Sequence, residues 1–406
     1  MTCAAELRLP VPGQKPRPAG RVRGREPFER ESVATATERL AEALPGGGEL
    51  AWRAPGRANL IGEHTDYNDG FVLPVALDLA TYIAGARHPG SLRLRSLDQA
   101  GEVVVDLTTG QGPDSGWGRY VAGVVKAMLD DGVELAGFDG IVASDIPIGS
   151  GLSSSAALEV AVASAIAIHP LEPLRQALIC RRAENIYVGV QTGIMDQLAS
   201  AAAKEDHALL IDCRDNTIDP VPMPSGLEIL VVDSGASRDL GSSAYNERRK
   251  ECELAAEAMG LGSLRDADLE RLESARRDMP DGAYRRARHI VTENQRVLDA
   301  ADALRRSDLE ALGSLFERSY RSYADDFEAS TPEIETLVSV AAATDGVVAA
   351  RLTGGGWGGC TVNLVRGDQG GRAAAGIAER YEAATGITAR WWISSASGGV
   401  RPVATG

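Results

Sequence analysis

Hydrophobic positions along the chain follow two different spacings, and the spacing identifies the predicted elements. Apolar residues three or four positions apart predict helices, and short runs rich in Val, Ile and Leu predict strands. The predicted helices span residues 33–44, 117–129, 158–168, 173–188 and 372–385, with a long helical region at 243–324 broken near 260–262 and 279–282. The predicted strands span residues 81–87, 92–97, 102–107, 208–213, 228–235, 347–353 and 361–365, followed by a closing strand. The mixture predicts an α+β fold with an antiparallel or mixed sheet.

The length of 406 residues exceeds that of a typical single domain, so two domains are expected. We predict a disordered extension at 1–26, which is rich in Pro, Gly and basic residues without periodicity. An N-terminal domain would then cover 27–220, and a C-terminal domain would cover 221–406.

The composition argues against several classes of partner. The formal charge is −15, whereas proteins that bind nucleic acids or anionic membranes need clustered basic residues. The longest apolar run, 160–168, is too short to span a bilayer, and the N-terminus has no apolar signal segment. Five scattered cysteines suggest neither a disulfide framework nor a zinc site. We therefore expect a cytoplasmic protein with a small-molecule partner.

The segment 145–167 reads DIPIGSGLSSSAALEVAVASAIA, a Gly- and Ser-rich turn that leads directly into an apolar helix. The first turn of a helix has free backbone N–H groups and partial positive charge, so it binds anions readily. Gly149 and Gly151 allow close approach of a phosphate, and Ser153, Ser154 and Ser155 add hydroxyl groups and a possible magnesium ligand. The alternative is an ordinary serine N-cap, but three consecutive serines exceed what a cap needs.

A second polar block, RAPGRANLIGEHTDYNDGFVLP, spans 53–74. Its apolar flanks indicate that Arg57, Glu63, His64, Asp66 and Tyr67 lie beside a core instead of in bulk water. Such donors and acceptors suit the several hydroxyls of a small polyol. Metal binding by His64 and Asp66 is the alternative, although a third nitrogen or sulfur ligand is missing.

The third block, 181–200, contains Glu184 on a predicted helix and Asp196 after a turn that contains Gly193. Beside a phosphate loop, one carboxylate could hold Mg²⁺ while the other accepts a proton or positions a nucleophile. A helix-face Glu and a capping Asp are an equally good explanation from spacing alone.

A glycine run, TGGGWGGC at 353–360, contains a formal GxGxxG motif. A strand follows it where a dinucleotide fold needs a helix, so the Rossmann interpretation fails. The chain also lacks GxxxxGK[ST]. These glycines indicate either a tight turn or close approach of the backbone to a ligand.

In this order, the blocks resemble the galactokinases of the GHMP kinase superfamily, from about Ala54 to the C-terminus. GRANLIGEHTDYNDG is similar to the galactokinase signature and is more specific than the shared GLSSSA motif. SAYNERRKEC, RARHIVTENQRV and RLTGGGWGGC are also similar to galactokinase segments. The resemblance implies a two-domain fold, with a ribosomal-protein-like N-terminal domain, a C-terminal domain containing a ferredoxin-like fold, and the active site in the cleft between them.

The resemblance also implies a reaction and its residues. ATP would phosphorylate the C1 hydroxyl of α-D-galactose, with Mg²⁺ as cofactor, in the first committed step of galactose catabolism by the Leloir pathway. Asp196 and Arg57 match the catalytic pair, and Ser155 and Glu184 match the metal ligands. The sugar-contacting positions are Glu63, His64, Thr65, Asp66, Gly193, Asp196 and Tyr245. The nucleotide-side positions are Ser96, Gly149, Ser150, Gly151, Leu152, Ser153, Ser154 and Ser155.

The sequence departs from the family pattern at several positions without losing a contacting group. Asp69 replaces a small residue, Trp357 replaces Phe, Gln191-Thr192 replaces Pro-Cys, and Tyr320 replaces His. Two alternatives stay open: a non-catalytic sensor of galactose and ATP that regulates transcription, and a kinase for N-acetylgalactosamine. The complete serine-rich loop favours the enzyme. We expect a monomer.

Overall fold

A computed structural model of the chain describes residues 34–44, 48–236 and 241–404. The predicted extension at 1–26 lies outside the described residues. Thr35–Gly406 forms one compact unit. The principal helices are α1 (Ala36–Ala43), α2 (Gly118–Asp130), α3 (Ser154–Ile166), α4 (Pro173–Arg182), α5 (Met195–Ala202), α6 (Gly241–Ala258), α7 (Leu269–Ser274), α8 (Asp281–Arg305), α9 (Leu309–Asp325), α10 (Pro332–Ala342) and α11 (Gly370–Thr385). The strands are β1 (Leu50–Asn59), β2 (Phe71–Val72), β3 (Pro74–Arg87), β4 (Ser91–Ser96), β5 (Glu102–Asp106), β6 (Phe138–Ser144), β7 (His207–Asp212), β8 (Thr217–Pro222), β9 (Leu227–Asp233), β10 (Val347–Leu352), β11 (Cys360–Arg366), β12 (Arg390–Ser394) and β13 (Arg401–Pro402).

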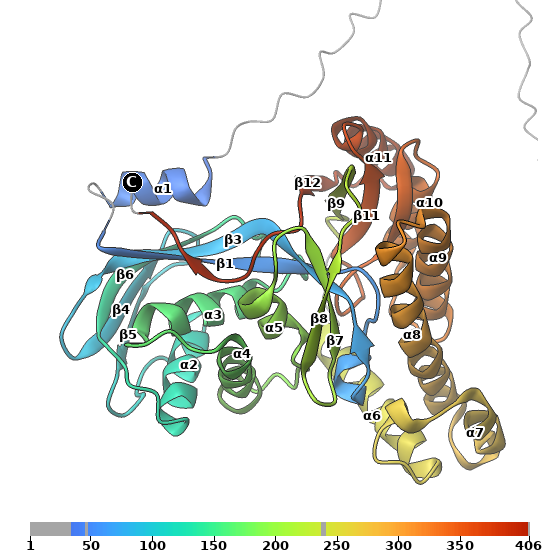
Figure 1. Cartoon of the computed structure of the whole chain (residues 1–406), viewed down its shortest axis with the longest axis horizontal. Coiled ribbons are helices and arrows are strands. Elements are labelled where there is room, and N and C mark those ends of the chain that lie inside the picture. Colours follow the sequence, from blue (N-terminus) through green and yellow to red (C-terminus); the bar gives the residue numbers. More distant parts are fainter. Residues whose placement is uncertain (1–33, 45–47, 237–240, 405–406) are drawn as a thin grey trace, which may run out of the picture. The chain divides into compact units, whose positions relative to one another are not determined.

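A six-stranded mixed sheet in the order β13-β1-β3-β6-β4-β5 joins five strands of the first half of the chain to β13 near its C-terminal end. Neighbouring strands are antiparallel except β4 and β6, which run parallel. Helix α1 packs through Ala36 and Leu40 against Ala84, Ile141 and Ala143 on one face of the sheet. Helices α3 and α5 contact β1 and β3 (Figure 1).

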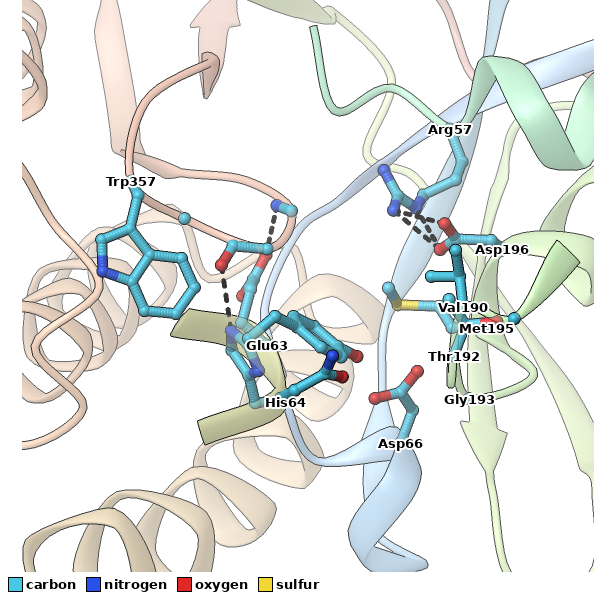
Figure 2. A pocket seen from close by; sticks show the side chains of 16 residues that line it. Arg57, Glu63, His64, Asp66, Val190, Thr192, Gly193, Met195, Asp196 and Trp357 are labelled. Carbon is cyan, nitrogen blue, oxygen red and sulfur yellow. Dashed lines mark hydrogen bonds and ion pairs between the residues drawn. The ribbon is translucent and has the colours of Figure 1, made fainter. Parts of the chain in front are cut away.

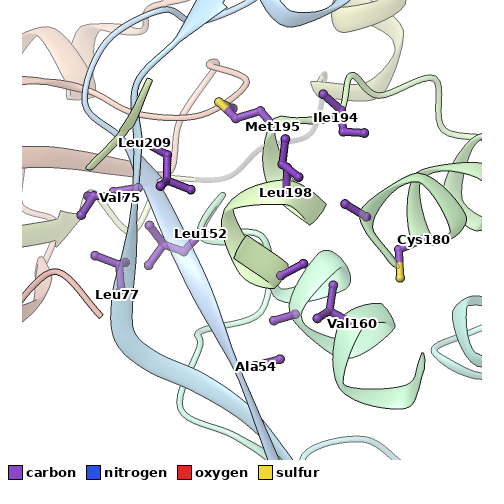
Figure 3. Packing of buried hydrophobic residues seen from close by; sticks show 14 of the residues in the cluster. Ala54, Val75, Leu77, Leu152, Val160, Cys180, Ile194, Met195, Leu198 and Leu209 are labelled. Atoms are coloured by element: carbon purple, nitrogen blue, oxygen red, sulfur yellow. The ribbon is translucent and has the colours of Figure 1, made fainter. Parts of the chain in front are cut away.

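Helix α3, which follows the Gly- and Ser-rich turn, is buried on nearly every side. Leu152, Val160 and Leu198 pack with Val75 and Leu77 in one large apolar cluster (Figure 3). Its small Ala side chains allow the helix to approach its neighbours closely. The Gly- and Ser-rich turn at residues 149–155, which we call the serine loop, is therefore attached to a rigid core.

The second half contains a four-stranded antiparallel sheet in the order β10-β11-β9-β12. Alternate residues of β9 belong to different cores, as expected for the two-residue period of a strand. Ile229 and Val231 join the large cluster that includes residues of α8 and α9. Leu230 and Val232 join a separate cluster with residues of α10 and α11. A third sheet, β2-β7-β8, pairs β2 from the signature segment with β7 and β8, which precede β9 in the chain.

Most predicted elements are confirmed, with shifted boundaries. The helix predicted from residue 158 begins at Ser154, and the helix predicted over 173–188 becomes π-helical over Ala183–Val188. The predicted breaks near 260 and 280 are present, and a further break separates α8 from α9. The sequence patterns missed the helices α5 and α10 and the strands β6 and β8.

Candidate functional site

A cavity of about 320 Å³ collects most of the polar residues singled out in the sequence (Figure 2). It is lined from the first half by Arg57, Glu63, His64, Asp66, Gly189, Val190, Thr192, Gly193, Met195 and Asp196, and from the second half by Tyr245, Asn246, Gly354, Gly355, Gly356 and Trp357. The volume lies within the range typical of small-molecule sites. Because the resemblance assigns several of its residues to the sugar, we use the name sugar cavity for it.

Glu63 lies at the inner wall of the sugar cavity and is 1% exposed. Its Oε2 forms an ion pair with Arg351, which is itself fully buried on β10. Gly354 N–H donates to Glu63 Oε1 at 3.3 Å. Burial raises the pKa of Glu63 to about 7, although Arg351 opposes that rise. One buried arginine thus orients the carboxylate and joins the signature loop to the glycine run.

Helix α8 supports the same loop from behind. Gly62 N–H donates to Glu293 Oε1 at 3.0 Å, and the Ser319 hydroxyl donates to that oxygen at 2.5 Å. Arg296 Nε donates to the other oxygen, Oε2, at 2.7 Å. Glu293 is fully buried, and its positive neighbours hold its pKa low, at about 2, against the effect of burial. A charged group in the core therefore fixes the backbone of the sugar-facing loop.

His64 is held by two tyrosines. Its Nδ1 is 2.8 Å from the Tyr67 hydroxyl, and its Nε2 is 3.1 Å from the Tyr323 hydroxyl and 3.2 Å from Gly355 O. Burial lowers the pKa of His64 to about 3, so the ring is neutral at physiological pH. A neutral imidazole suits hydrogen bonding to a hydroxyl group and not charge pairing.

Asp66 lies directly beside Gly193 in the cavity wall (Figure 2). A Cβ built on Gly193 would lie 2.0 Å from Asp66 Oδ2, so only glycine fits beside this carboxylate. Burial, and next the charge of Asp196, raise the pKa of Asp66 to about 6. Two carboxylates therefore share one small cavity.

Asp196 lies in the first turn of α5 and is bound by three donors. Arg57 Nε and Nη2 donate to Oδ1 and Oδ2 at 2.8 Å each, and the Ser153 hydroxyl donates to Oδ2 at 2.5 Å. Arg57 Nη1 also donates to Gly151 O at 2.6 Å. The side chain of Asp196 does not cap α5, whose N-cap residue is Ile194. Asp196 and Arg57 thus connect the sugar cavity to the serine loop.

The serine loop borders a second cavity of about 500 Å³, which we call the nucleotide cavity. Its lining includes Ser96, Trp117, Gly149, Ser154 and Ser155. Gly151 has φ +82° and Ser153 has φ 60°, so the loop needs left-handed conformations just before α3 begins. This geometry presents the N-terminus of α3, with its free N–H groups, as an anion site.

Two side-chain oxygens that could hold a cation lie beside this loop. The Ser155 hydroxyl is 3.2 Å from Glu184 Oε1, and Glu184 is only 5% exposed. Burial, and next the charge of Asp196, raise the pKa of Glu184 to about 7. No set of three or more His, Cys, Asp or Glu side chains suited to a metal occurs within 34–44, 48–236 and 241–404. A pair of oxygens fits Mg²⁺, which uses one or two carboxylates together with substrate phosphates and water.

Three residues of the predicted site have other partners in the structure. The Thr65 hydroxyl donates to Gly62 O and Phe71 O, and Thr65 does not line the sugar cavity. The Ser150 hydroxyl donates to Pro147 O, and Leu152 is buried in the apolar cluster. These positions shape the two loops from within.

Sequence reasoning missed several cavity residues. Thr192 directly precedes Gly193 and Met195 directly precedes Asp196, but no motif identified either as a cavity residue. Arg351 was missed because its partner Glu63 is remote in the chain. The sequence does not decide whether the glycine run forms only a turn or also contacts a ligand. In the structure, Gly354, Gly355 and Gly356 line the cavity.

The remaining structural features agree with the composition. Cys180, Cys213, Cys252 and Cys360 are buried free cysteines. Within the part of the chain that the structure describes, no helix has the length and apolarity needed to cross a membrane.

Comparisons with known proteins identify the family. The galactokinase galactose-binding signature matches residues 42–87, the GHMP kinases N terminal domain matches 119–204, and the GHMP kinases C terminal family matches 300–383. A galactokinase of Roseiflexus sp. (strain RS-1) is 44% identical over 86% of this chain and 91% of its own length. A galactokinase of Bos taurus is 42% identical over 93% of this chain and 98% of its own length.

Solved structures agree. Lactococcus lactis galactokinase complexed with galactose superposes with a TM-score of 0.85 at 31% identity, covering 90% of this chain and 98% of that one. Methanococcus jannaschii mevalonate kinase shares the fold, with a TM-score of 0.61 at 18% identity over 86% of this chain and 99% of its own. The chain has the GHMP kinase fold and belongs to the galactokinase family.

Proposed function

We propose that this ATP-dependent sugar kinase transfers the γ-phosphoryl group of ATP to the C1 hydroxyl of α-D-galactose, giving galactose 1-phosphate and ADP. The observation that carries the proposal is the position of the Arg57–Asp196 pair. Both residues line the sugar cavity, and both bind the serine loop through Gly151 O and the Ser153 hydroxyl. A sugar hydroxyl and a bound phosphate would therefore meet at this pair.

Asp196 orients the attacking hydroxyl and accepts its proton. The C1 oxygen forms a bond to the γ-phosphorus while the bond from that phosphorus to the β,γ-bridging oxygen breaks, which leaves ADP. Because the transition state of phosphoryl transfer is loose, the proton moves late, and a carboxylate is a sufficient base. Arg57 holds Asp196 in place through two hydrogen bonds and contributes positive charge near the transferring group.

Ser155 and Glu184 would hold Mg²⁺, which would supply positive charge to the phosphates when it is bound. Asp66, neutral His64 and Tyr245 would contact the sugar hydroxyls, and Glu63 would complete the inner wall. Ser96 and the loop from Gly149 to Ser155 would enclose the nucleotide. The arrangement divides the substrates between the two cavities.

An ADP-release assay tests the proposal. Purified enzyme with Mg-ATP is offered galactose, glucose, N-acetylgalactosamine or mevalonate in turn. We expect turnover with galactose alone. Turnover only with N-acetylgalactosamine would overturn the choice of sugar. If none of the four compounds gives ADP release while calorimetry still shows binding of galactose and ATP, the chain is a sensor and not a kinase.

Three further expectations belong to this proposal. The division into domains at 27–220 and 221–406 is tested by limited proteolysis near the boundary. A monomer is tested by light scattering coupled to gel filtration. A cytoplasmic location is tested by fractionation of the cells that express the protein.

A further inference from the structure

Glu184, the proposed carboxylate ligand of Mg²⁺, has different partners at its two oxygens. Oε1 faces the Ser155 hydroxyl at 3.2 Å. Oε2 accepts from Gln197 Nε2 at 2.7 Å and from the Thr192 hydroxyl at 3.1 Å. A carboxylate held through one oxygen by two donors presents its other oxygen in a fixed direction.

Gln197 is one of these two donors, and the interior of the protein fixes it. It is fully buried on α5, and its Nε2 is also 3.2 Å from Glu159 Oε2, another fully buried group. It lines neither cavity. Gln197 therefore belongs to the rigid core behind Glu184.

Thr192 is the other donor, and it belongs to the wall of the sugar cavity. The side-chain amide of Asn185 holds its backbone at both ends. Thr192 N–H donates to Asn185 Oδ1 at 3.0 Å, and Asn185 Nδ2 donates to Thr192 O at 3.1 Å. Glu184 and Asn185 are neighbours in the π-helical segment, a rare geometry that often occurs at functional sites. This segment therefore places the Thr192 hydroxyl within hydrogen-bond distance of two acceptors, Glu184 Oε2 at 3.1 Å and Asn185 Oδ1 at 3.2 Å.

The contacts of Glu184 thus reach both cavities. Ser155 lines the nucleotide cavity, and Thr192 lines the sugar cavity. We propose that Thr192 is a positioning residue: its hydroxyl holds Glu184 in the orientation that binds the metal, and so connects the wall of the sugar cavity to the metal site. The inference rests on the proposed role of Glu184 as a metal ligand.

A simpler role for Thr192 would be direct contact with the sugar. The two roles predict different measurements, because a positioning residue changes the affinity for metal and a sugar contact changes the affinity for galactose. Valine has nearly the shape of threonine without its hydroxyl, and serine keeps the hydroxyl without the methyl group. Thr192 is half-buried, so the fold should tolerate both.

The test measures Mn²⁺ binding to the full-length enzyme with the β,γ-imido analogue of ATP, from the loss of the free Mn²⁺ signal in electron paramagnetic resonance. We expect Thr192→Val to weaken Mn²⁺ binding by about tenfold, the lower end of the effect of losing an outer hydrogen bond to a metal ligand. Thr192→Ser should stay within about twofold of the wild type because it keeps the donor. Galactose affinity by calorimetry should be unchanged in both, while kcat falls in the valine variant.

Two further variants make the outcome decisive. Thr336→Val is the matched control, because the Thr336 hydroxyl makes an exposed hydrogen bond to Pro332 O of its own helix, α10, which lines neither cavity. Glu184→Gln tests the proposed function itself, since normal Mn²⁺ binding by this variant would show that Glu184 is not the ligand. If Glu184→Gln weakens binding and Thr192→Val does not, the inference about Thr192 is overturned and the metal site stands. Weaker galactose binding with unchanged Mn²⁺ binding in Thr192→Val would make Thr192 a sugar contact and also overturn the inference.

Discussion

Replacement of Gly193 by alanine would put a methyl group where the Asp66 carboxylate now lies. The added Cβ would fall 2.0 Å from Asp66 Oδ2 and 2.3 Å from Asp66 Cγ. Gly193 has no positive φ, so alanine would add no backbone strain. The perturbation is therefore steric and acts on one side chain.

The size of the effect follows from that distance. Real Cβ atoms keep at least 3.0 Å from such neighbours, so the carboxylate has to retreat by about 1 Å. A displacement of about 1 Å in a site that positions a substrate can cost about 100-fold in rate, or about 2.7 kcal/mol. We expect kcat/KM for galactose to fall by about that factor, mostly through KM, because Asp196 keeps its partners.

Steady-state ADP release at saturating Mg-ATP, with galactose varied, measures both constants. Gly376→Ala is the matched control, since a Cβ at Gly376 on α11 meets nothing within 4 Å. Thermal unfolding of each variant confirms that the protein is folded. Asp66→Ala and the double variant Gly193→Ala/Asp66→Ala complete a cycle that isolates the interaction.

The reasoning would be refuted by either of two results. One is a folded Gly193→Ala variant whose kcat/KM stays within about threefold of the wild type, well short of the expected effect. The other is a Gly193→Ala change that is as damaging in the Asp66→Ala background as in the wild type, because the clash could then not act through Asp66.

Three other changes test the remaining groups. Asp196→Asn should lower kcat by at least about 1,000-fold while galactose affinity stays within about tenfold; near wild-type turnover would exclude Asp196 as the proton acceptor. Burial raises the pKa of Asp66 to about 6, so its carboxylate is charged above that pH and neutral below it. Galactose affinity by calorimetry should therefore fall as pH drops from 7 to 5 in the wild type, and a flat profile would contradict a charged acceptor. Arg351→Met should lower the free energy of unfolding in urea by about 3–5 kcal/mol at pH 8, because it leaves Glu63 buried without its cation. The loss should be smaller at pH 5.5, because the pKa of Glu63 is about 7 even with Arg351 beside it, so the buried carboxyl is then protonated with or without that cation. An equal loss at both pH values would argue against this pairing.

The residues that the sequence predicted well are those whose chemistry is local. In the serine loop, Gly151 adopts the positive φ that its residue type permits, and the loop enters a helix as the apolar pattern indicates. The signature likewise brings Glu63, His64 and Asp66 to one cavity. Thr65 shows the limit of such reasoning, because a polar residue inside a binding motif donates to backbone carbonyls and supports the loop instead.

The features that the sequence did not predict depend on contacts between distant segments. Helix α5 has only 8 residues, too few for a pattern to identify it, and its packing on α3, α4 and β1 stabilises it. The buried Arg351 lies in a strand of otherwise apolar residues, and only the folded chain shows its partner. The bonds of Thr192 likewise depend on a π-helical turn that no sequence pattern marked.

The hydrogen bonds that Glu293 accepts from Gly62 and Ser319 tie the signature loop to helices α8 and α9. A change in these helices would therefore move the loop. In a saturation mutagenesis screen, a substitution at Glu293 or Ser319 would then be scored as a defect in substrate use, although neither residue lines the cavity. Variants of natural populations at these two positions would be classed with active-site variants by their phenotype, and with core variants by their location. Positions at which substitution lowers activity should therefore include buried charged residues behind the cavity as well as the residues that line it.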